Sequence, residues 1–365
     1  MTQIIGAPSK YIQGNGELSK LGLYCSQLGA KGAYAIVDPF IFSLYGEEIT
    51  RSFEANSIVL VQEEFGGECS MEQVERMVSA ALAAVSSGVI VGIGGGKTLD
   101  TAKAVSHFAG LPVVVVPTVA STDAPCSALS VLYTEDGRLD RYLPLRRSPD
   151  VVIADVDVIA KAPPRLLAAG MGDALSTYYE ARACRSSGAV TQAGGSSSIA
   201  AFTLAKACRD TLLADGADAL RDCREGTGSE AVGRIVEANI YLSGIGFESG
   251  GLAAAHAIHN GLTLLEECRH VLHGEKVAFA TLAQLMLEQA PAEEIEEVIA
   301  FSRMAGLPVT LSELGLNNAQ EERLMIAAEA SCAADNPMGN MPFAVSPQQV
   351  LDAILAADRR GQQAP

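Results

Sequence analysis

The sequence predicts an α/β domain with a Rossmann-like parallel sheet, followed by an all-α domain. Two observations lead to this fold class. Within residues 1–161, short runs rich in Val and Ile alternate with segments of helical character, whereas residues 162–365 consist mainly of long Ala- and Leu-rich segments. A chain of 365 residues is also long for a single hydrophobic core. We therefore expect a domain boundary after Lys161, where Pro163 and Pro164 suit the start of a helix.

Four apolar runs mark the expected strands of the first domain. They are GAYAIVD (32–38), SIVLVQ (57–62), GVIVGIG (88–94) and PVVVVPT (112–118). Because each run is apolar almost throughout, we expect strands that are buried on both faces of a parallel sheet. Helical segments are expected at 71–85 and 97–110, and LSVLYT (129–134) and VVIAD (151–155) are expected to add further strands.

Composition and charge exclude several classes of protein. With 48% hydrophobic residues the chain can form sizeable cores, and a formal net charge of −17 argues against nucleic acid or an anionic membrane as its partner. Residues 77–96 carry no charge, but Ser-Ser-Gly interrupts them and three glycines end them, which indicates a helix, a turn and a buried strand rather than a membrane span. The eight cysteines are widely spread without a C-x-x-C pair, as in a cytoplasmic protein with reduced thiols.

Three consecutive glycines, Gly94–Gly96, lie between an expected strand and an expected helix. The first N–H groups of a helix have no partners within it and attract phosphate, and glycines let a pyrophosphate approach the backbone. The loop matches neither common fingerprint, because Val91 replaces a Walker A glycine and Lys97 replaces the third glycine of G-x-G-x-x-G. The alternative is a turn that only packs the strand against the helix. Asp100 and Lys103 follow on that helix.

Polar residues follow two other expected strands. Asp38 ends the run at 32–38, where a carboxylate can bind a ribose and disfavour the extra phosphate of NADP; the alternative is a turn residue before Pro39. The loop at 117–130 carries hydroxyl groups and Asp123 at the carboxyl end of a strand, where open α/β sheets bind ligands. Its side chains suit a ribose, a nicotinamide amide or a polyol, unless the loop is an ordinary Ser/Thr-rich turn.

Four of the five histidines form two His-x-x-His pairs, His256 with His259 and His270 with His273. Such pairs suggest a metal site, and zinc sites usually draw a further ligand from elsewhere in the chain. Asp173, an isolated carboxylate among small and apolar residues, is the best candidate. One Asp and two His would leave a divalent metal with net positive charge and open positions, as a Lewis acid requires. For each histidine, the alternative is a core or capping residue.

Five motifs together resemble the glycerol dehydrogenase branch of the iron-containing alcohol dehydrogenase and dehydroquinate synthase superfamily. They are GGGKTLDTAKAV, VPTVASTDAPCSALSVLYT, AGMGDALSTYYEA, GFESGGLAAAHAIHNGLT and HGEKVAFATLAQL. They occur in the family's order at compatible spacing, and the likeness runs through nearly the whole chain. The resemblance implies an NAD-binding α/β domain over 1–161 and a helical metal- and substrate-binding domain over 162–365, with the active site in the cleft. It also implies a homo-oligomer, often an octamer.

The resemblance further implies which residues bind each group. Zinc would be held by Asp173, His256 and His273, and these residues would act in catalysis and contact the substrate together with Asp123. His259 would lie beside the site, and His270 would be structural or at the surface. With the whole glycine loop included, the predicted NAD-binding residues are Asp38, Gly94, Gly95, Gly96, Lys97, Asp100, Thr118, Ser121, Ser127, Leu129 and Tyr133.

The implied activity is the reversible NAD-dependent oxidation of glycerol to dihydroxyacetone, by hydride transfer from C2 with zinc as a Lewis acid. Thr177 stands where iron-dependent members carry a further histidine, which favours the zinc-using branch. The alternatives are another vicinal diol such as 1,2-propanediol or 2,3-butanediol, a glycerol phosphate, and lyase chemistry like that of dehydroquinate synthase. A glycerol phosphate would require cationic residues near these motifs, and the sequence shows no concentrated Lys/Arg group there.

Overall fold

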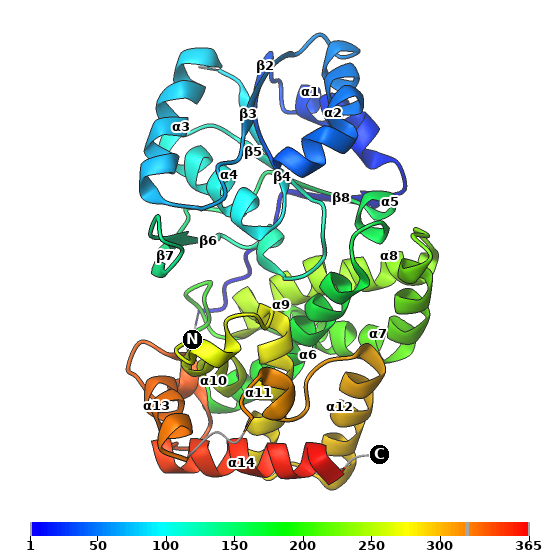
Figure 1. The fold of residues 1–365 in the computed structure, drawn as a ribbon. Coiled ribbons are helices and arrows are strands. Elements are labelled where there is room, and N and C mark those ends of the chain that lie inside the picture. Colours follow the sequence, from blue (N-terminus) through cyan, green and yellow to red (C-terminus); the bar gives the residue numbers. More distant parts are fainter. Residues whose placement is uncertain (1, 86, 318–320, 364–365) are drawn as a thin grey trace.

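The chain folds into an α/β part and a helical part, which lie one above the other in Figure 1. This computed structural model describes residues 2–85, 87–317 and 321–363. The strands of the described residues lie between Lys10 and Asp155, and the first long helix of the lower part begins at Pro164. The predicted fold class is therefore confirmed, and the secondary structure changes at the expected position. The division into two domains stays a prediction.

Six parallel strands form the main sheet, in the order β1-β8-β5-β4-β2-β3. The apolar runs predicted as strands occupy its centre, as β2, β4, β5 and β8. The bounds are β1 (Lys10–Gly14), β2 (Gly32–Val37), β3 (Val59–Glu64), β4 (Val89–Gly94), β5 (Val113–Pro117) and β8 (Val151–Asp155).

Three details of the predicted sheet were wrong or incomplete. The run 129–134 is a strand as expected, β6 (Leu129–Tyr133), but the prediction was incomplete because β6 pairs with the unpredicted β7 (Leu139–Pro144) in a separate antiparallel hairpin. β3 lies at an edge rather than buried on both faces, and its Val59 is 67% exposed. β1 was not predicted, because KYIQG is short and only half-buried. These elements depend on their partners in the fold more than on their own hydrophobicity.

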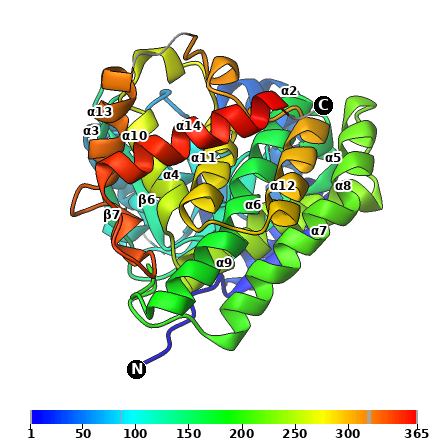
Figure 2. The same cartoon turned by 90° about the horizontal axis from the view of Figure 1, so that it is seen from below.

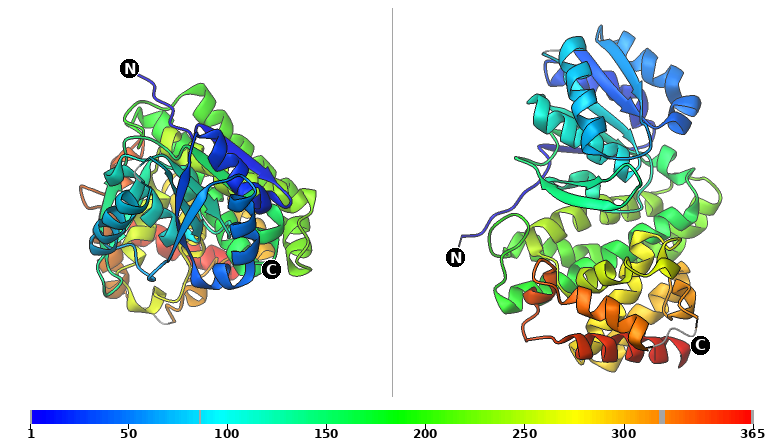
Figure 3. Two further views of the ribbon diagram at one scale, coloured as in Figure 1. Left: turned by 90° about the horizontal axis from the view of Figure 1, so that it is seen from above. Right: turned by 60° about the vertical axis from the view of Figure 1, so that its left-hand side comes forward.

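Helices cover both faces of the sheet, as the view from above in Figure 3 shows. On one face, Phe53 of the second helix packs in the same core as Val91 of β4. On the other face, Met77 of the third helix packs with Ile90, the neighbour of Val91 along β4. The side chains of successive strand residues therefore pack in the cores on opposite faces of the sheet, as expected for a sheet covered on both sides. The helices are α1 (Leu21–Gln27), α2 (Pro39–Glu54), α3 (Met71–Ala84), α4 (Gly96–Ala109) and α5 (Val156–Ala160).

The helical part is built around α6 and α11, and Figure 2 shows α14 lying across it against α11 and α13. Between α8 and α9 the chain makes one π-helical turn, Ala238–Leu242, without a break in the helix. The helices are α6 (Pro164–Ser187), α7 (Ile199–Arg224), α8 (Glu230–Glu237), α9 (Ser243–Gly250), α10 (Ala254–Leu262), α11 (His273–Leu287), α12 (Ala292–Ala305), α13 (Glu321–Ser331) and α14 (Pro347–Gln363). No helix in the described part of the chain is both long and apolar enough to span a membrane.

Two glycines let α6 and α11 approach each other closely beside the site described below. A Cβ built on Gly172 of α6 would lie 2.5 Å from the carbonyl oxygen of Gly274, and a Cβ on Gly274 would lie 1.8 Å from the carbonyl oxygen of Ala169. Neither position therefore accepts a side chain without movement of a backbone. The crossing places Asp173, the next residue on α6, against His273, the first residue of α11.

The extended segment before β1 joins the two parts of the chain. Gln3 makes an isolated bridge to Ser196, and the N–H of Gly6 donates to the hydroxyl of Ser249 at 3.1 Å. The right-hand view of Figure 3 shows this segment running down beside the helical part. The first residues of the chain therefore contact the helices, although β1 itself belongs to the sheet.

Candidate active site

The predicted ligand-binding residues of the α/β part gather at the carboxyl ends of three neighbouring strands. Asp38 follows β2, Gly94 ends β4 and Thr118 follows β5. The N–H of Asp38 donates to the carbonyl of Ile93 at 2.9 Å, and the N–H of Thr118 donates to the carbonyl of Gly94 at 3.1 Å. Asp38 precedes the glycine loop in sequence but lies beside it in space, because β2 and β4 pair directly.

Asp38 also caps a helix. Its Oδ1 accepts the N–H groups of Phe40 and Ile41 at 2.9 and 3.2 Å, and Pro39 is the first residue of α2. The turn-forming explanation for this aspartate is therefore correct as far as one carboxylate oxygen is concerned. The same residue lines a pocket of about 520 Å³, so capping α2 and facing a ligand are compatible roles.

The glycines of the loop divide into two groups. A Cβ on Gly94 would lie 2.7 Å from the hydroxyl of Thr98, so packing of β4 against α4 requires a glycine there. A Cβ on Gly95 or Gly96 would find its nearest neighbours only at 3.9 and 4.0 Å. Packing therefore accounts for Gly94 but leaves Gly95 and Gly96 unexplained. Both lie at the start of α4 and line the 520 Å³ pocket, together with Asp38, Pro39, Phe65, Gly66, Gly67, Lys97 and Thr98.

Asp100 and Lys103 of α4 lie inside the fold rather than in this pocket. Their side chains form an ion pair of 2.9 Å and are 7% and 1% exposed. Asp100 accepts the N–H of Val131 at 3.1 Å, and Lys103 donates to the carbonyl oxygens of Ala124 and Leu129. Burial raises the pKa of Asp100, although the Lys103 charge opposes the shift. The geometry thus gives Asp100 a structural function, anchoring the loop that carries other predicted residues.

The remaining predicted NAD-binding residues lie on that anchored loop or beside it. Ser127 is buried and donates to the carbonyl of Ala124 at 3.0 Å. Lys97 forms an ion pair with Glu68 at 2.5 Å, and its ammonium group lies 4.8 Å from the centre of the Tyr133 ring. Lys97 and Tyr133 therefore lie together, whereas Thr118, Ser121 and Leu129 follow β5 or begin β6.

In the helical part, Asp173, His256 and His273 form one cluster. Their ligand atoms all lie within 4.8 Å of one another. Oδ1 of Asp173 lies 3.2 Å from Nε2 of His273 and 3.5 Å from Nε2 of His256. The Asp173 side chain is 1% exposed, and its Oδ2 is a buried oxygen without a hydrogen-bond partner among the residues that the structure describes. Burial would raise the pKa of Asp173, but the two imidazoles outweigh it and lower the pKa well below its usual value.

The other nitrogen of each imidazole is held by a different group. Nδ1 of His256 lies 2.6 Å from Oε2 of Glu180, and Nδ1 of His273 lies 2.9 Å from Nε2 of His259. Burial lowers the pKa of His256, but the carboxylates of Glu180 and Asp173 outweigh it and raise the pKa well above normal. Burial, followed by the neighbouring imidazoles, lowers the pKa of His259. Both Nε2 atoms are therefore directed to Asp173, which is the arrangement of imidazoles that bind a common cation.

Asp123 adjoins this cluster from the loop of the α/β part. Its Oδ2 accepts the hydroxyl of Ser243 at 2.8 Å, and that hydroxyl lies 2.8 Å from Oγ1 of Thr177. Burial raises the pKa of Asp123 well above its usual range, and the charge of Asp173 adds to the shift. The loop itself is held by Asn239 of the π-helical turn, which donates to the carbonyl of Ala120 at 2.9 Å. Such turns are frequent at functional sites.

Comparison with known proteins shows which family the chain belongs to. The model of the iron-containing alcohol dehydrogenase family matches residues 8–156. A glycerol dehydrogenase from Citrobacter freundii is 52% identical over 363 residues, which are 100% of this chain and 99% of that protein. The chain belongs to the iron-containing alcohol dehydrogenase family. As a member of that family it is an oxidoreductase.

Solved structures of this family agree over the whole chain. The glycerol dehydrogenase of Schizosaccharomyces pombe superposes with a TM-score of 0.95 at 38% identity, covering 99% of this chain and 92% of that one. A probable glycerol dehydrogenase from Sinorhizobium meliloti 1021 gives a TM-score of 0.92 at 43% identity, covering 99% of each chain. The sequence resemblance to the iron-containing alcohol dehydrogenase family is thus confirmed in both halves.

Sequence reasoning missed two residues of this family member's site. Glu180 lies seven residues after Asp173 on α6, on the same helix face, and is fully buried. Its Oε1 accepts the N–H groups of Ala253 and His256 at 2.8 and 2.9 Å. Helical periodicity places it on the same face of α6 as Asp173, but only the contact with His256 distinguishes it from other acidic residues. Ser243 gave no such signal. His270, in contrast, is exposed as expected.

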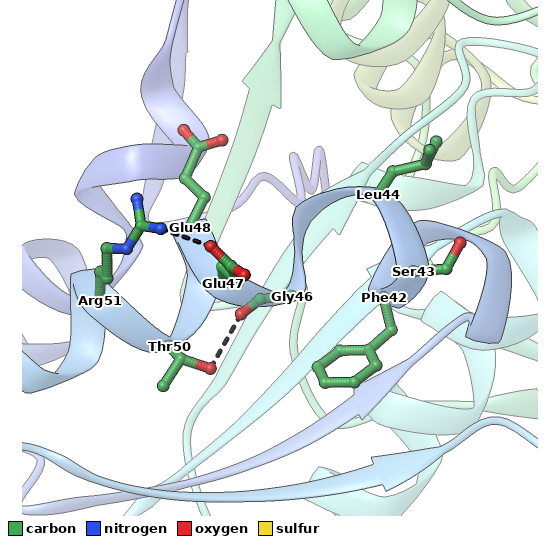
Figure 4. A pocket seen from close by; sticks show the side chains of 8 residues that line it. All are labelled: Phe42, Ser43, Leu44, Gly46, Glu47, Glu48, Thr50 and Arg51. Atoms are coloured by element: carbon green, nitrogen blue, oxygen red, sulfur yellow. Dashed lines mark hydrogen bonds and ion pairs between the residues drawn. The ribbon is translucent and has the colours of Figure 1, made fainter.

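A second hollow lies on the outer side of α2 and is larger, at about 810 Å³ (Figure 4). Its polar groups pair with one another along the helix: Arg51 with Glu47, and the Thr50 hydroxyl with the carbonyl of Gly46. None of the site residues predicted from the sequence lines this hollow. The sheet edge and the cluster of Asp173, His256 and His273 therefore remain the candidate active site.

Proposed function

We propose that this family member is an NAD-dependent glycerol dehydrogenase, which oxidises the C2 hydroxyl of glycerol to give dihydroxyacetone, NADH and a proton. The observation that carries the proposal is the buried Oδ2 of Asp173. It has no hydrogen-bond partner within the described part of the chain, and it lies beside two imidazoles already fixed by other groups. An unpaired buried carboxylate oxygen is costly in a folded protein, and a bound cation removes that cost. The relatives named glycerol dehydrogenase indicate the substrate.

We propose zinc as the cation, held by Asp173, His256 and His273. Two imidazole nitrogens and one carboxylate suit zinc and leave an open position for substrate. Thr177, one helical turn after Asp173, supports a three-ligand site because its hydroxyl is paired with Ser243. Iron(II) also accepts two histidines and a carboxylate, so metal analysis belongs to the test.

The start of α4 fits NAD. The open space above Gly95 and Gly96 is a cradle that a Cβ would fill, and the first N–H groups of α4 would hold the pyrophosphate there. Asp38 would accept hydrogen bonds from the adenosine ribose, and its charge would disfavour NADP. The other proposed NAD contacts are Lys97, Thr118, Ser121, Ser127, Leu129 and Tyr133. Asp100 would not contact NAD but anchors the loop through the N–H of Val131.

When bound, the cation supplies Lewis acidity toward a substrate hydroxyl, and NAD supplies the hydride acceptor. The chain's own groups decide which substrate is positioned. Asp123 would accept a hydrogen bond from one hydroxyl of the polyol, which a simple alcohol cannot offer. Ser243 holds the Asp123 carboxylate, and Glu180 and His259 hold the two imidazoles. Asp123 and Asp173 are buried, so the carboxylates that would face the substrate and the cation are themselves shielded from bulk water.

The test is NADH formation with glycerol under saturating NAD, before and after removal of metal with a chelator. We expect activity to disappear with the metal and to return with zinc more fully than with iron(II). A panel with 1,2-propanediol, 2,3-butanediol and glycerol 3-phosphate tests the choice of diol. Asp173→Asn should abolish activity and zinc binding, while His270→Gln should change neither. Full activity in the metal-free protein would refute the proposed mechanism, and turnover without accumulation of NADH would indicate the lyase alternative.

We further propose that the protein works in the cytoplasm as a homo-oligomer, with an octamer expected from the resemblance. The eight cysteines support a reducing compartment, since all are free thiols and seven are buried. Light scattering of the purified protein measures the assembly. A strictly monomeric species at working concentration would contradict this expectation.

A further inference from the structure

His259 lies in the site without serving as a ligand in the proposed metal centre. It is 7% exposed, and both of its ring nitrogens have partners. Nε2 lies 2.9 Å from Nδ1 of His273, and Nδ1 lies 3.1 Å from Oδ1 of Asn260. With both nitrogens engaged, His259 has no lone pair to offer to a cation held by the other residues.

The contacts continue beyond His259 as a chain of amides. Nδ2 of Asn260 donates to Oδ1 of Asn336 at 2.7 Å. Nδ2 of Asn336 donates to the backbone carbonyl of Ala330 at 2.7 Å. The chain therefore runs from the site through α10 to the end of α13, where it stops on a group of the main chain.

The backbone carbonyl of Ala330, at the end of this hydrogen-bonded chain, fixes the direction of every hydrogen bond in it. A backbone carbonyl only accepts, so Asn336 must direct its NH2 group toward Ala330 and its oxygen toward Asn260. Asn260 then presents its own oxygen to His259, which must carry its proton on Nδ1. The free lone pair is left on Nε2 of His259, which accepts the Nδ1 proton of His273. Nε2 of His273 consequently keeps its lone pair, on the side that faces Asp173.

The hydrogen-bonded chain that begins at His259 carries no charge, whereas the group that holds His256 is a carboxylate. His256 is oriented by the carboxylate of Glu180, and Asp173 adds a second buried negative charge. Asp123, which adjoins the cluster, is a third buried acidic group. A further carboxylate in place of His259 would add negative charge to a buried site that already holds three acidic groups, which is costly without water. A neutral chain orients His273 without that cost.

We propose that His259 is a positioning residue, which uses the directed chain through Asn260 and Asn336 to hold His273 in the tautomer that binds a cation through Nε2. This inference rests on the proposed function, because it assumes that a divalent cation occupies the cluster. Groups that hold a ligating imidazole in this way change metal affinity by about 10- to 100-fold when they are removed. His259 therefore sets how tightly the cation is bound, although it does not contact it.

Two variants at one position separate the hydrogen bonds from the volume of the side chain. His259→Leu fills the space but neither accepts nor donates. His259→Gln can accept from His273 with its oxygen and donate to Asn260 with its NH2 group, so it preserves the direction of the chain. His270→Gln is the matched control, since His270 is exposed and lies close in sequence. The zinc affinity of each full-length, metal-free protein is measured by competition with a chromogenic chelator, and the visible spectrum of the cobalt(II) form reports the ligand geometry.

We expect His259→Leu to bind zinc about 10- to 100-fold more weakly than the unchanged protein. His259→Gln should recover most of that loss, and its cobalt(II) spectrum should match that of the unchanged protein, as should that of His270→Gln. Equal zinc affinity in His259→Leu and the unchanged protein would overturn the inference, and so would equal losses in His259→Leu and His259→Gln. If the unchanged protein binds no divalent cation, the proposed function fails first, which is a distinct result.

Discussion

Replacing Gly274 by Ala tests whether the close approach of α6 and α11 creates the metal site. The added Cβ would lie 1.8 Å from the carbonyl oxygen of Ala169, whereas real Cβ contacts stay beyond about 3.0 Å. The two helices must therefore separate by about 1.2 Å at this point. That shift is large beside the 3.2 Å contact between Asp173 and His273, which lie next to the crossing. Overpacking of this kind lowers the free energy of unfolding by about 1–3 kcal/mol.

A misplacement of about 1 Å also costs roughly 100-fold in rate when it affects reacting groups. We therefore expect Gly274→Ala to lower kcat/KM for glycerol by about that factor and to weaken zinc binding. The assays are NADH formation, chelator competition for zinc, and thermal unfolding of the metal-free protein. Gly233→Ala is the matched control. Gly233 lies within helix α8, and its added Cβ would lie 3.6 Å from the nearest neighbouring atom, Nε2 of Gln13. This substitution should raise the free energy of unfolding by about 0.5–1 kcal/mol. Unchanged zinc affinity and activity in Gly274→Ala would refute the reasoning.

Three further predictions address other parts of the site. Glu180→Gln removes the charge that holds His256 and should weaken zinc binding by about 10- to 100-fold in the chelator competition; wild-type affinity would show that the carboxylate is dispensable. Gly96→Val fills the cradle at the start of α4. It should raise the KM for NAD by about tenfold or more, equal to about 1.4 kcal/mol of binding free energy, and leave zinc affinity unchanged. An unaltered KM would place the pyrophosphate elsewhere. Lys103→Met leaves the buried Asp100 carboxylate unpaired and should lower the free energy of unfolding by about 3–5 kcal/mol in denaturant titration, whereas a loss below 1 kcal/mol would contradict the buried ion pair.

The central strands were predictable because their sequences carry a strong local signal. β5 is a continuous run of Val that ends in proline, β4 consists of Val and Ile apart from Gly92 and Gly94, and both are buried throughout. β1 and β7 lack such a signal, and the run that forms β6 was predicted as a strand without its partner. β1 pairs with β8 and β6 pairs with β7, and one short segment does not contain that information.

The candidate site could be predicted from the sequence only where the type of a residue by itself suggests its chemistry. Asp173 and the clustered histidines drew attention because such residues are rare in their surroundings. The carboxylate of Glu180 looked like many other acidic residues of this chain. What distinguishes it is its burial against His256, 76 residues later, and that contact exists only after α6 and α10 have packed. The role of His259 likewise depends on Asn336, which no spacing rule connects to it.

Thr177 connects the proposed metal ligands to the carboxylate that is proposed to hold the substrate. It lies one helical turn after Asp173, so a histidine at this position would place a further nitrogen beside the cation. Its hydroxyl pairs instead with Ser243, and Ser243 donates to Asp123. Because Ser243 has only one proton, the bond from Thr177 must point toward it. Thr177 therefore supports, through Ser243, the Asp123 carboxylate that is proposed to hold the polyol, and it adds no metal ligand. A substitution of Thr177 should alter metal preference and substrate preference together.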